Sequence, residues 1–260
     1  MPILYSMKKV SIITACYNRE KTIQTAIESV ISQSYNNIEY IIIDGSSKDR
    51  SVEIINRYID KIDCFVSEKD TGIYNALNKG IKNSTGEIIG LLHSDDFFYS
   101  NDTIRKIVDV FENTDADIVY ANGMYVDEND ISVVKRIYKA RKFNEKYLFF
   151  GWIPLHTTIF VKKEVFNKYG LYLENYKIAS DYEISLRWFK NNRLKKVFFN
   201  DWVVKMRLGG KSTDFKQQKL KSQEDLQIIR NYKLKGKLTL LLKILRKIPQ
   251  YILPKFITYK

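Results

Sequence analysis

The chain has 260 residues, of which 45% are hydrophobic and 28% are charged, and its formal net charge is +13 at pH 7. This composition is typical of a globular protein with one sizeable core, and it excludes an intrinsically disordered chain. The positive charge predicts an anionic partner, which can be a phosphorylated substrate, an anionic lipid or a nucleic acid.

The two cysteines, Cys16 and Cys64, show no paired spacing. The sequence therefore predicts neither a disulfide framework nor a zinc site, and it suits a reducing compartment. No apolar run is long enough to span a bilayer, and the first residues do not resemble a signal peptide. We expect a cytoplasmic protein, free or at the inner face of the cell membrane.

The first part of the chain alternates strands with helices. The predicted elements are a strand over 10–14, a helix over 21–35, a strand over 38–44, a helix within 45–59, a short strand near 63–67, a helix over 73–84 and a strand over 87–96. This alternation is typical of an α/β protein in which right-handed crossovers build a mainly parallel sheet with helices on both faces.

The later part predicts a second set of elements and a helical appendage. These are a helix over 102–114, a hairpin with strands over 117–126 and 133–140, a strand over 157–161, a short helix ending near 170, a helix over 179–192, strands over 195–200 and 202–208, and a loop over 209–213. The four prolines mark no linker. We therefore expect one catalytic domain with a helical appendage at its C-terminal end.

Polar clusters follow three of the predicted strands, at residues 14–18, 44–49 and 94–96. In open α/β sheets ligands bind at the carboxyl ends of the strands. The third cluster ends in the adjacent carboxylates Asp95 and Asp96, which repel each other unless a positive charge lies beside them. A divalent cation would supply that charge, although a turn in which Asp96 or Asp102 caps a helix also fits the residues.

Five motifs occur in order: SIITACYNRE (11–20), IIIDGSSKDRS (41–51), DTGIYNALNKGIKNSTGEIIGLLHSDD (70–96), ASDYE (179–183) and LGGKS (208–212). Together they resemble family 2 glycosyltransferases with the GT-A fold, and the resemblance covers residues 9–212. It implies transfer of a sugar, with inversion, from a nucleotide-diphosphate donor to an acceptor hydroxyl. It also implies a role in bacterial surface polysaccharide biosynthesis, as for O-antigen or capsule.

The resemblance assigns the 94–96 cluster to a metal site. Asp96 would bind Mn²⁺ or Mg²⁺ at the donor diphosphate, and Ser94 and Asp95 would contact the ribose or the metal-bound water. A cation there would stabilise the negative charge of the leaving phosphate. His156 would lie near the metal or diphosphate, although a lone histidine among apolar residues is often structural. His93 is a weaker candidate for the same role.

Further residues would hold the donor, for which UDP is expected. Asp44 would accept the N3–H of uracil, or serve only as a turn residue. Thr14, Ala15 and Tyr17 would hold the base, with burial in the core as the alternative for Tyr17. Asp70 would face the ribose. Lys79 would face the phosphate, or lie in solvent on its helix.

On the acceptor side, the resemblance makes Asp181 the general base that takes the proton of the attacking hydroxyl. Many relatives carry Glu-Asp where this chain has Ser180 and Asp181, and Glu183 is the second candidate. A helix N-cap is the alternative role for Asp181. Arg207 and Lys211 flank a glycine-rich loop that would bring positive charge to the diphosphate.

We expect a catalytic domain over 1–215, with a donor half over 1–100 and an acceptor half over 101–215, and a basic tail over 216–260. Residues 226–260 hold nine basic and no acidic side chains. As a helix, the tail places Leu238, Leu241, Leu245 and Ile248 on one face and Lys243, Arg246 and Lys247 on the other.

Two arrangements of this tail are open. It either lies in the headgroup region of an anionic bilayer, which would suit a glycan acceptor on a polyprenyl diphosphate, or packs on the domain with its lysines in water.

Three other functions are compatible with parts of the sequence. A nucleic-acid-binding protein would explain the charge, but the basic excess concentrates in the amphipathic tail, so we expect no nucleic-acid partner. A dinucleotide-binding enzyme is disfavoured because neither a G-x-G-x-x-G nor a Walker lysine motif occurs. An inactive GT-A scaffold and a homo-oligomer stay open.

Overall fold

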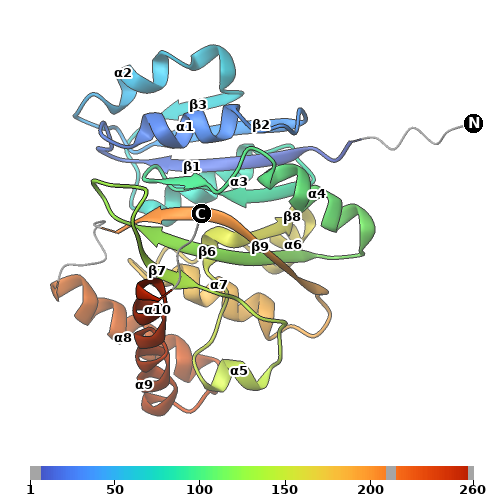
Figure 1. The fold of residues 1–260 in the computed structure, drawn as a ribbon, viewed down its shortest axis with the longest axis vertical. Coiled ribbons are helices and arrows are strands. Elements are labelled where there is room, and N and C mark those ends of the chain that lie inside the picture. The colour runs from blue at the N-terminus through green and yellow to red at the C-terminus, as the bar shows by residue number, and fades with distance from the viewer. Residues whose placement is uncertain (1–6, 209–214, 257–260) are drawn as a thin grey trace, which may run out of the picture.

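A mixed β-sheet organises the molecule, which a computed structural model describes over residues 7–208 and 215–256 (Figure 1). In these residues the sheet has nine strands in the order β3-β2-β1-β4-β8-β6-β9-β5, and β7 pairs with β6. The predicted α/β class is therefore confirmed.

The first part of the sheet is parallel. Its elements are β1 (Val10–Cys16), α1 (Ile23–Ile31), β2 (Ile38–Asp44), α2 (Ser51–Asn56), η1 (Ile59–Lys61), β3 (Cys64–Ser67), α3 (Ile73–Asn83) and β4 (Ile88–Leu91). Strand β1 pairs in parallel with β2 and β4, and β2 pairs with β3. The central strands β1 and β2 are almost entirely buried and mostly apolar because helices cover both of their faces.

The second part of the sheet is largely antiparallel. Its elements are β5 (Asp96–Phe98), α4 (Thr103–Asn113), β6 (Ile118–Val126), β7 (Val134–Tyr138), α5 (Lys146–Phe149), η2 (His156–Thr158), β8 (Ile159–Lys162), α6 (Lys163–Tyr169), α7 (Ser180–Phe189) and β9 (Lys196–Arg207). Of the pairings here, β6–β9 is parallel, whereas β4–β8, β5–β9, β6–β7 and β6–β8 are antiparallel. The predicted parallel arrangement thus belongs to the first part.

Two predictions of strand boundaries were wrong. The separate strands expected over 195–200 and 202–208 are one strand, β9, whose register against β6 shifts between Tyr120 and Asn122. A β-bulge at that shift accommodates the polar pair Asn200 and Asp201, which resembled a turn in the sequence. The strand expected over 87–96 ends at Leu91, and a turn separates it from β5.

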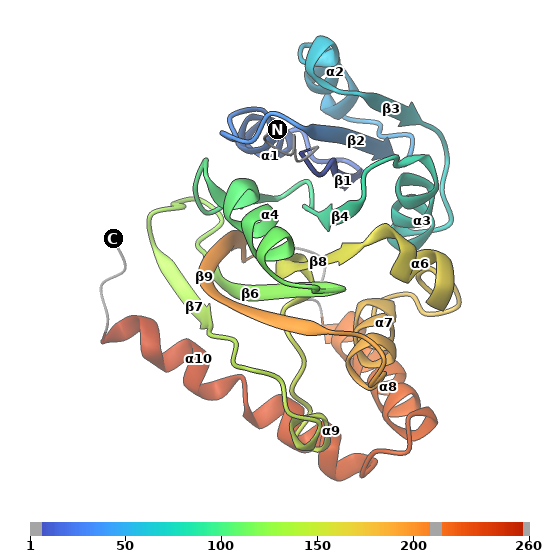
Figure 2. The ribbon, with the colours of Figure 1, turned by 90° about the vertical axis from the view of Figure 1, so that its right-hand side faces the viewer.

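Helices lie on both sides of the sheet. In Figure 2, α1 and α4 lie on one side, and α3, α6 and α7 lie on the other. The remaining helices, α8 (Phe215–Asn231), α9 (Lys237–Leu245), α10 (Ile248–Ile252) and η4 (Leu253–Lys255), follow the sheet in the chain. Helix α8 packs against α7 and α9, and α10 packs against β7, so this appendage covers the second part of the sheet. In the described ranges no helix is long and apolar enough to cross a membrane.

The appendage turns its basic face inward, which is the opposite of the expected packing with the lysines in water. The Lys243 side chain is only 12% exposed and its Nζ lies 2.7 Å from Asp225 Oδ1. In contrast, Leu241, Leu245 and Ile248 are 52%, 46% and 53% exposed. The expectation of outward-facing lysines was wrong because partners far away in the sequence compensate the buried charges.

Candidate functional site

The loops that follow β1 and β2 are joined at the carboxyl edge of the sheet. The backbone N–H of Asn18 donates to Ser47 Oγ at 2.8 Å, and its side-chain oxygen accepts from the Lys48 N–H at 2.8 Å. Arg19 follows, and its backbone N–H donates to Ser51 Oγ at 2.7 Å. Asn18 has a positive φ of 52°, a conformation that asparagine adopts more readily than most residues.

Tyr17 and Asp70, two of the predicted donor residues, meet around Gly45. A Cβ at Gly45 would lie 2.5 Å from Asp70 Oδ2 and 3.3 Å from Tyr17 Cδ2, so only glycine lets both side chains approach here. Tyr17 is 45% exposed, which leaves its ring accessible to a planar base. Asp70 Oδ1 accepts the N–H of Gly72 at 3.0 Å.

Asp44 ends β2 and is fully buried. Its carboxylate accepts the Ser47 N–H at 3.0 Å and the Ser67 hydroxyl at 2.7 Å. These hydrogen bonds are the ones expected if Asp44 serves as a turn residue, and they also hold its carboxylate at the rim.

Three other predicted donor residues, Thr14, Ala15 and Lys79, contribute differently. Thr14 is buried with its hydroxyl 3.3 Å from the Tyr40 hydroxyl, and Ala15 is buried as well. Their side chains thus belong to the core, and only their backbone groups could contact a donor at the rim. Lys79 forms an ion pair of 2.7 Å with Glu68, and its ammonium group also donates to the Lys69 carbonyl oxygen at 3.4 Å. In the described part of the chain, these contacts do not bring Lys79 to the other predicted donor residues.

The 94–96 motif joins this rim through Asp95. Arg19 Nε lies 3.7 Å from Asp95 Oδ2, and the Arg207 guanidinium donates to the Asp95 carbonyl oxygen at 2.8 Å. Ser94 is buried in the turn before β5. Two arginines, from the first and the last strand regions of the sheet, therefore hold the motif in place.

Asp96 is the member of this motif that fits a metal ion. It is buried, and within the described chain neither carboxylate oxygen has a hydrogen-bond partner. Burial, followed by the neighbouring charge of Asp95, raises the pKa of Asp96 well above its usual range. An unpartnered buried carboxylate is costly unless a cation compensates it, and carboxylate oxygen is the donor that Mg²⁺ and Mn²⁺ prefer.

No group of three or more His, Cys, Asp or Glu side chains suited to a metal occurs in the described ranges. A cation at Asp96 would therefore depend on the donor diphosphate for much of its coordination, as Mg²⁺ often does.

The two histidines link the 94–96 motif to Asp181. His93 Nε2 lies 2.7 Å from His156 Nε2, and His156 Nδ1 lies 3.5 Å from Asp181 Oδ2. Both nitrogens of His156 thus face protein groups. The negative charges of Asp95 and Asp181 each act to raise the pKa of His93, so His93 lies near both carboxylates.

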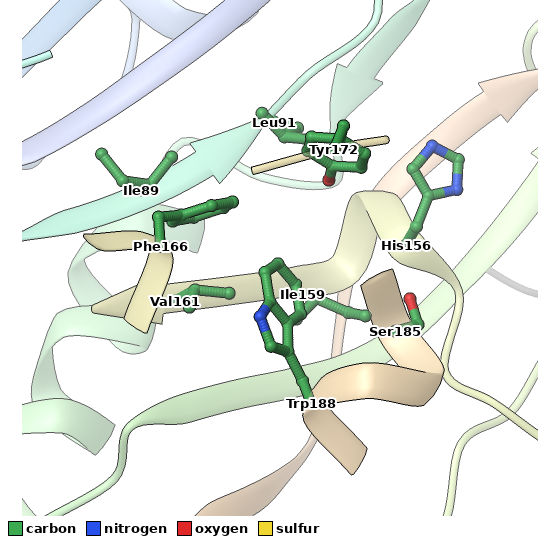
Figure 3. A pocket seen from close by; sticks show the side chains of 9 residues that line it. All are labelled: Ile89, Leu91, His156, Ile159, Val161, Phe166, Tyr172, Ser185 and Trp188. Carbon is green, nitrogen blue, oxygen red and sulfur yellow. The ribbon is translucent and has the colours of Figure 1, made fainter. Parts of the chain in front are cut away.

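Burial keeps both histidines neutral. It lowers the pKa of His93, and it lowers the pKa of His156 to about 4 despite the nearby carboxylate of Asp181. Figure 3 shows the cause for His156: its ring lies at the edge of a small pocket with mainly apolar walls, including Leu91, Ile159 and Tyr172. Because one neutral imidazole donates and the other accepts, the short contact between them is a hydrogen bond.

Asp181 lies in the first turn of α7. Burial alone would raise its pKa, but nearby positive charge, first of all that of Lys221, outweighs this effect and lowers it. Asp181 is therefore ionised at neutral pH, the state that a general base requires. Glu183, the second candidate, points elsewhere: it pairs with Arg187 and accepts the Tyr232 hydroxyl at 2.6 Å.

Helix α8 supplies two residues that the sequence analysis missed. Glu224 accepts the backbone N–H groups of residues 177, 178 and 179 at 2.8, 3.0 and 2.9 Å, immediately before α7. Lys221, one turn earlier, acts electrostatically on Asp181. The available signal was the adjacent pair Glu224 and Asp225, the last acidic residues before a purely basic segment.

The structure thus gathers Tyr17, Asp44 and Asp70 at one rim, ties Asp95 to it through Arg19, and links His93, His156 and Asp181 to one another. Arg207 lies beside the 94–96 motif. Lys211 lies outside the described residues.

Comparison with known proteins agrees with these features. The family profile "Glycosyl transferase family 2" matches residues 11–170. An uncharacterized glycosyltransferase of Rickettsia prowazekii is 32% identical over 227 residues, which cover 84% of this chain and 70% of the relative. One of Rickettsia typhi is 33% identical over 203 residues, which cover 75% of this chain but 62% of the relative.

Solved structures show the same fold. Staphylococcus aureus TarS 1–349 in complex with UDP has a TM-score of 0.61 at 20% identity, covering 84% of this chain and 65% of that one. The mannosyltransferase PcManGT from Pyrobaculum calidifontis, in complex with GDP-Man and Mn²⁺, has a TM-score of 0.66 at 15% identity, covering 96% and 74%. The fold is that of the GT-A glycosyltransferases, and the chain belongs to glycosyl transferase family 2.

Proposed function

We propose that this chain transfers a sugar from a nucleotide-diphosphate donor, most suitably a UDP-sugar, to a hydroxyl of a glycan or lipid-linked acceptor, with inversion. The observation that carries this proposal is the contact chain from His93 through His156 to Asp181, with distances of 2.7 and 3.5 Å. It connects the loop of the 94–96 motif to the ionised carboxylate of Asp181 on helix α7. A donor site and a base on opposite sides of one reacting carbon are what inversion needs.

The donor would occupy the rim of the first half, residues 1–100. Tyr17 and Asp70 would contact the nucleoside, and the buried Asp44 would accept a hydrogen bond from the base, which favours uracil over bases without that N–H. Asp96 would hold a divalent cation. When bound, this cation would stabilise the leaving phosphate as a Lewis acid, and Arg19 and Arg207 would add positive charge beside it.

The acceptor would lie on the side of residues 101–215, against α7. Asp181 would accept the hydroxyl proton as that oxygen attacks the sugar. His156 would orient the carboxylate from one side and Tyr74, whose hydroxyl lies 3.4 Å from Asp181 Oδ1, from another. Held in this way, the base would be positioned before the substrate arrives.

The ligands and activities of similar proteins support the proposed substrate class. TarS binds UDP-GlcNAc, PcManGT binds GDP-Man with Mn²⁺, and a Mycobacterium tuberculosis relative, 26% identical over 191 residues, is a PGL/p-HBAD biosynthesis glycosyltransferase. For this chain we propose a role in bacterial surface polysaccharide biosynthesis, with Mn²⁺ or Mg²⁺ as the cofactor.

We also propose that the appendage contacts the inner face of the cell membrane. Its outward apolar stripe consists of Leu238, Leu241, Ile244, Leu245 and Ile248. Exposed lysines at positions 235, 237 and 255 flank this stripe. Apolar residues with basic neighbours suit an anionic leaflet, whereas a second copy of this basic segment would be repelled. An acceptor carried on a polyprenyl diphosphate would then be within reach.

A thermal-shift screen of nucleotide sugars, with and without Mn²⁺, tests the donor site. The cognate donor with metal should raise the melting temperature, because a ligand at 100 times its Kd stabilises the native state by about 2.7 kcal/mol. A donor panel that produces no metal-dependent shift would contradict the proposed function.

A further inference from the structure

We infer that a cluster of basic side chains beside Asp181 is a binding site for the diphosphate of an isoprenoid-linked acceptor. The basic cluster comprises Arg136, Lys221, Lys243, Arg246 and Lys247. This inference deepens the proposed function and rests on it, since it gives the acceptor a chemical class and a place.

The cluster is assembled from separate elements. Arg136 comes from β7, Lys221 from α8 and Lys243 from α9, while Arg246 and Lys247 lie between α9 and α10. Helix α8 packs against α9, and α10 packs against β7, so the fold itself brings these positions together. The charges also affect one another's pKa: Arg136 acts to lower the pKa of Lys221, and Lys221 acts to lower the pKa of Lys243 and of Lys247.

Two members of the cluster, Arg136 and Lys243, are fixed in place by neighbouring side chains. The Arg136 guanidinium donates twice to Gln250 Oε1, at 2.8 and 2.6 Å, and lies 4.5 Å from the centre of the Tyr125 ring. Lys243 Nζ pairs with Asp225 and lies 3.2 Å from the centre of the Tyr182 ring. These contacts hold the cations in a defined arrangement before any ligand binds.

Three members keep hydrogen-bonding capacity. Within the described part of the chain, the ammonium groups of Lys221 and Lys247 form neither a hydrogen bond nor an ion pair, and Arg246 Nε is buried without a partner. Arg246 Nη2 has only long contacts, 3.4 Å to the Gly151 carbonyl oxygen and 3.5 Å to the Tyr138 hydroxyl. Arginine and lysine donors left in this state suit phosphate oxygens.

The carboxylates nearby do not balance the cluster. Asp225 pairs with Lys243, Glu224 is occupied by three backbone N–H groups, and Asp181 faces His156. Burial, followed by repulsion from Lys221, lowers the pKa of Lys247. Five cations against three carboxylates leave an uncompensated positive charge in a partly buried place, which a bound dianion would neutralise.

The position of the cluster identifies the ligand as the acceptor. The charge of Asp181 has the largest effect on the pKa of Lys221. An anion held by Lys221 would therefore lie next to the base and away from the donor rim. In this segment the side chain of Lys243 is turned inward, whereas those of Leu241, Leu245 and Ile248 are exposed on the outer side. A diphosphate with an attached isoprenoid chain matches both features, because the head would enter the cluster and the chain would follow the apolar stripe.

Binding of farnesyl diphosphate, a short water-soluble isoprenoid diphosphate, to the full chain tests this inference by calorimetry. Metal-free buffer with EDTA keeps the cation-dependent donor site from binding the probe. We expect wild-type protein to bind farnesyl diphosphate and not farnesol, and the Lys221→Gln/Lys247→Gln double variant to bind it at least tenfold more weakly, because two charged contacts to the diphosphate are lost. The matched control is Lys235→Gln/Lys237→Gln, which removes the same charge from exposed positions of the appendage.

The arms of this experiment separate the alternatives. The nucleotide-sugar thermal shift should be unchanged in both double variants, and its absence in wild type would count against the proposed function and not against the cluster. No binding of farnesyl diphosphate to wild type, or equal weakening in both double variants, would overturn the inference. Lysine-dependent binding to phosphatidylglycerol vesicles without binding of farnesyl diphosphate would assign the cluster to a lipid headgroup instead. If the double variant does not fold, Lys247→Gln alone, measured in the same way, replaces it.

Discussion

The Glu224 carboxylate accepts the backbone N–H of Ala179 at 2.9 Å, and this bond joins helix α8 to the residue that precedes the helix of Asp181. Helix α7 has no side-chain N-cap of its own, and the Glu224 carboxylate from another helix instead holds the three residues that lead into it. A negative charge at this end also interacts favourably with the helix dipole. The orientation of the proposed base therefore depends on a segment outside the motifs that resemble the family.

Replacing Glu224 with alanine should lower the turnover number without weakening donor binding. The loop before α7 would lose three charge-assisted hydrogen bonds, and displacement of the base by about 1 Å can cost on the order of a hundredfold in rate. Steady-state kinetics together with a nucleotide-sugar thermal shift measures both effects. Gln227→Ala, at an exposed position of the same helix, is the control and should be active. Full activity of Glu224→Ala would show that α8 does not position the base.

Lys221→Gln should move the acid limb of the pH–rate profile to higher pH. The sign follows from Asp181, whose pKa is lowered chiefly by Lys221 against the effect of burial. Without that positive charge the pKa of Asp181 rises, so the base becomes protonated at a higher pH and activity is lost sooner on acidification. Lys221→Arg keeps the charge and should keep the profile. A profile that does not move in Lys221→Gln would separate Lys221 from the base.

Asp96→Asn should stabilise the protein while abolishing metal-dependent turnover. The folded-state pKa of Asp96 is raised above its ordinary value. Ionisation of Asp96 therefore costs stability as the pH rises from the ordinary pKa of the unfolded state to the raised pKa of the folded state. The variant avoids this cost, which is about 1–3 kcal/mol for a buried group without partners, or roughly 2–4 °C in melting temperature per kcal/mol.

The difference in melting temperature should be largest at neutral pH and vanish below about pH 3, where the carboxylate is protonated in both states. Melting curves without metal across this range provide the measurement. A variant less stable than wild type at pH 7 would mean that Asp96 is compensated by the protein itself. Retained metal-dependent activity would remove the metal role.

The sequence was sufficient for the first part of the sheet because its strands are mostly apolar and end in polar residues, as β2 does at Asp44. The same reasoning failed at β9, where Asn200 and Asp201 resembled a turn. Asp201 bonds to the Trp202 N–H at 2.8 Å and to Lys106 at 2.8 Å, so a polar pair within a strand is satisfied locally and across the fold.

The site was predicted where motif residues lie at strand ends, and it was missed where contacts join distant segments. The contact of His93 with His156 spans 63 residues, and no local pattern encodes it. Helical periodicity separated the two faces of α9 correctly, but it could not show which face turns inward. That choice depends on Asp225 and Tyr182, which compensate Lys243 only in the folded chain.

The outward stripe predicts the effect of a triple substitution on membrane binding. Replacing Leu241, Leu245 and Ile248 with serine should weaken co-sedimentation with phosphatidylglycerol vesicles about a hundredfold, since each half-exposed side chain would contribute about 1 kcal/mol on burial in lipid. These side chains are 46–53% exposed, so the melting temperature should change little. Unchanged vesicle binding with a folded protein would refute the proposed membrane contact.

The most direct test of the central claim is the Asp181→Asn variant, assayed with the donor identified in the thermal-shift screen and bacterial membranes as the source of acceptor. The substitution preserves the shape of the side chain and removes its capacity to take a proton. We expect sugar transfer to fall by at least a hundredfold while the metal-dependent thermal shift with donor stays as in wild type. Transfer at the wild-type rate, with the donor bound equally well, would contradict the assignment of Asp181 as the base.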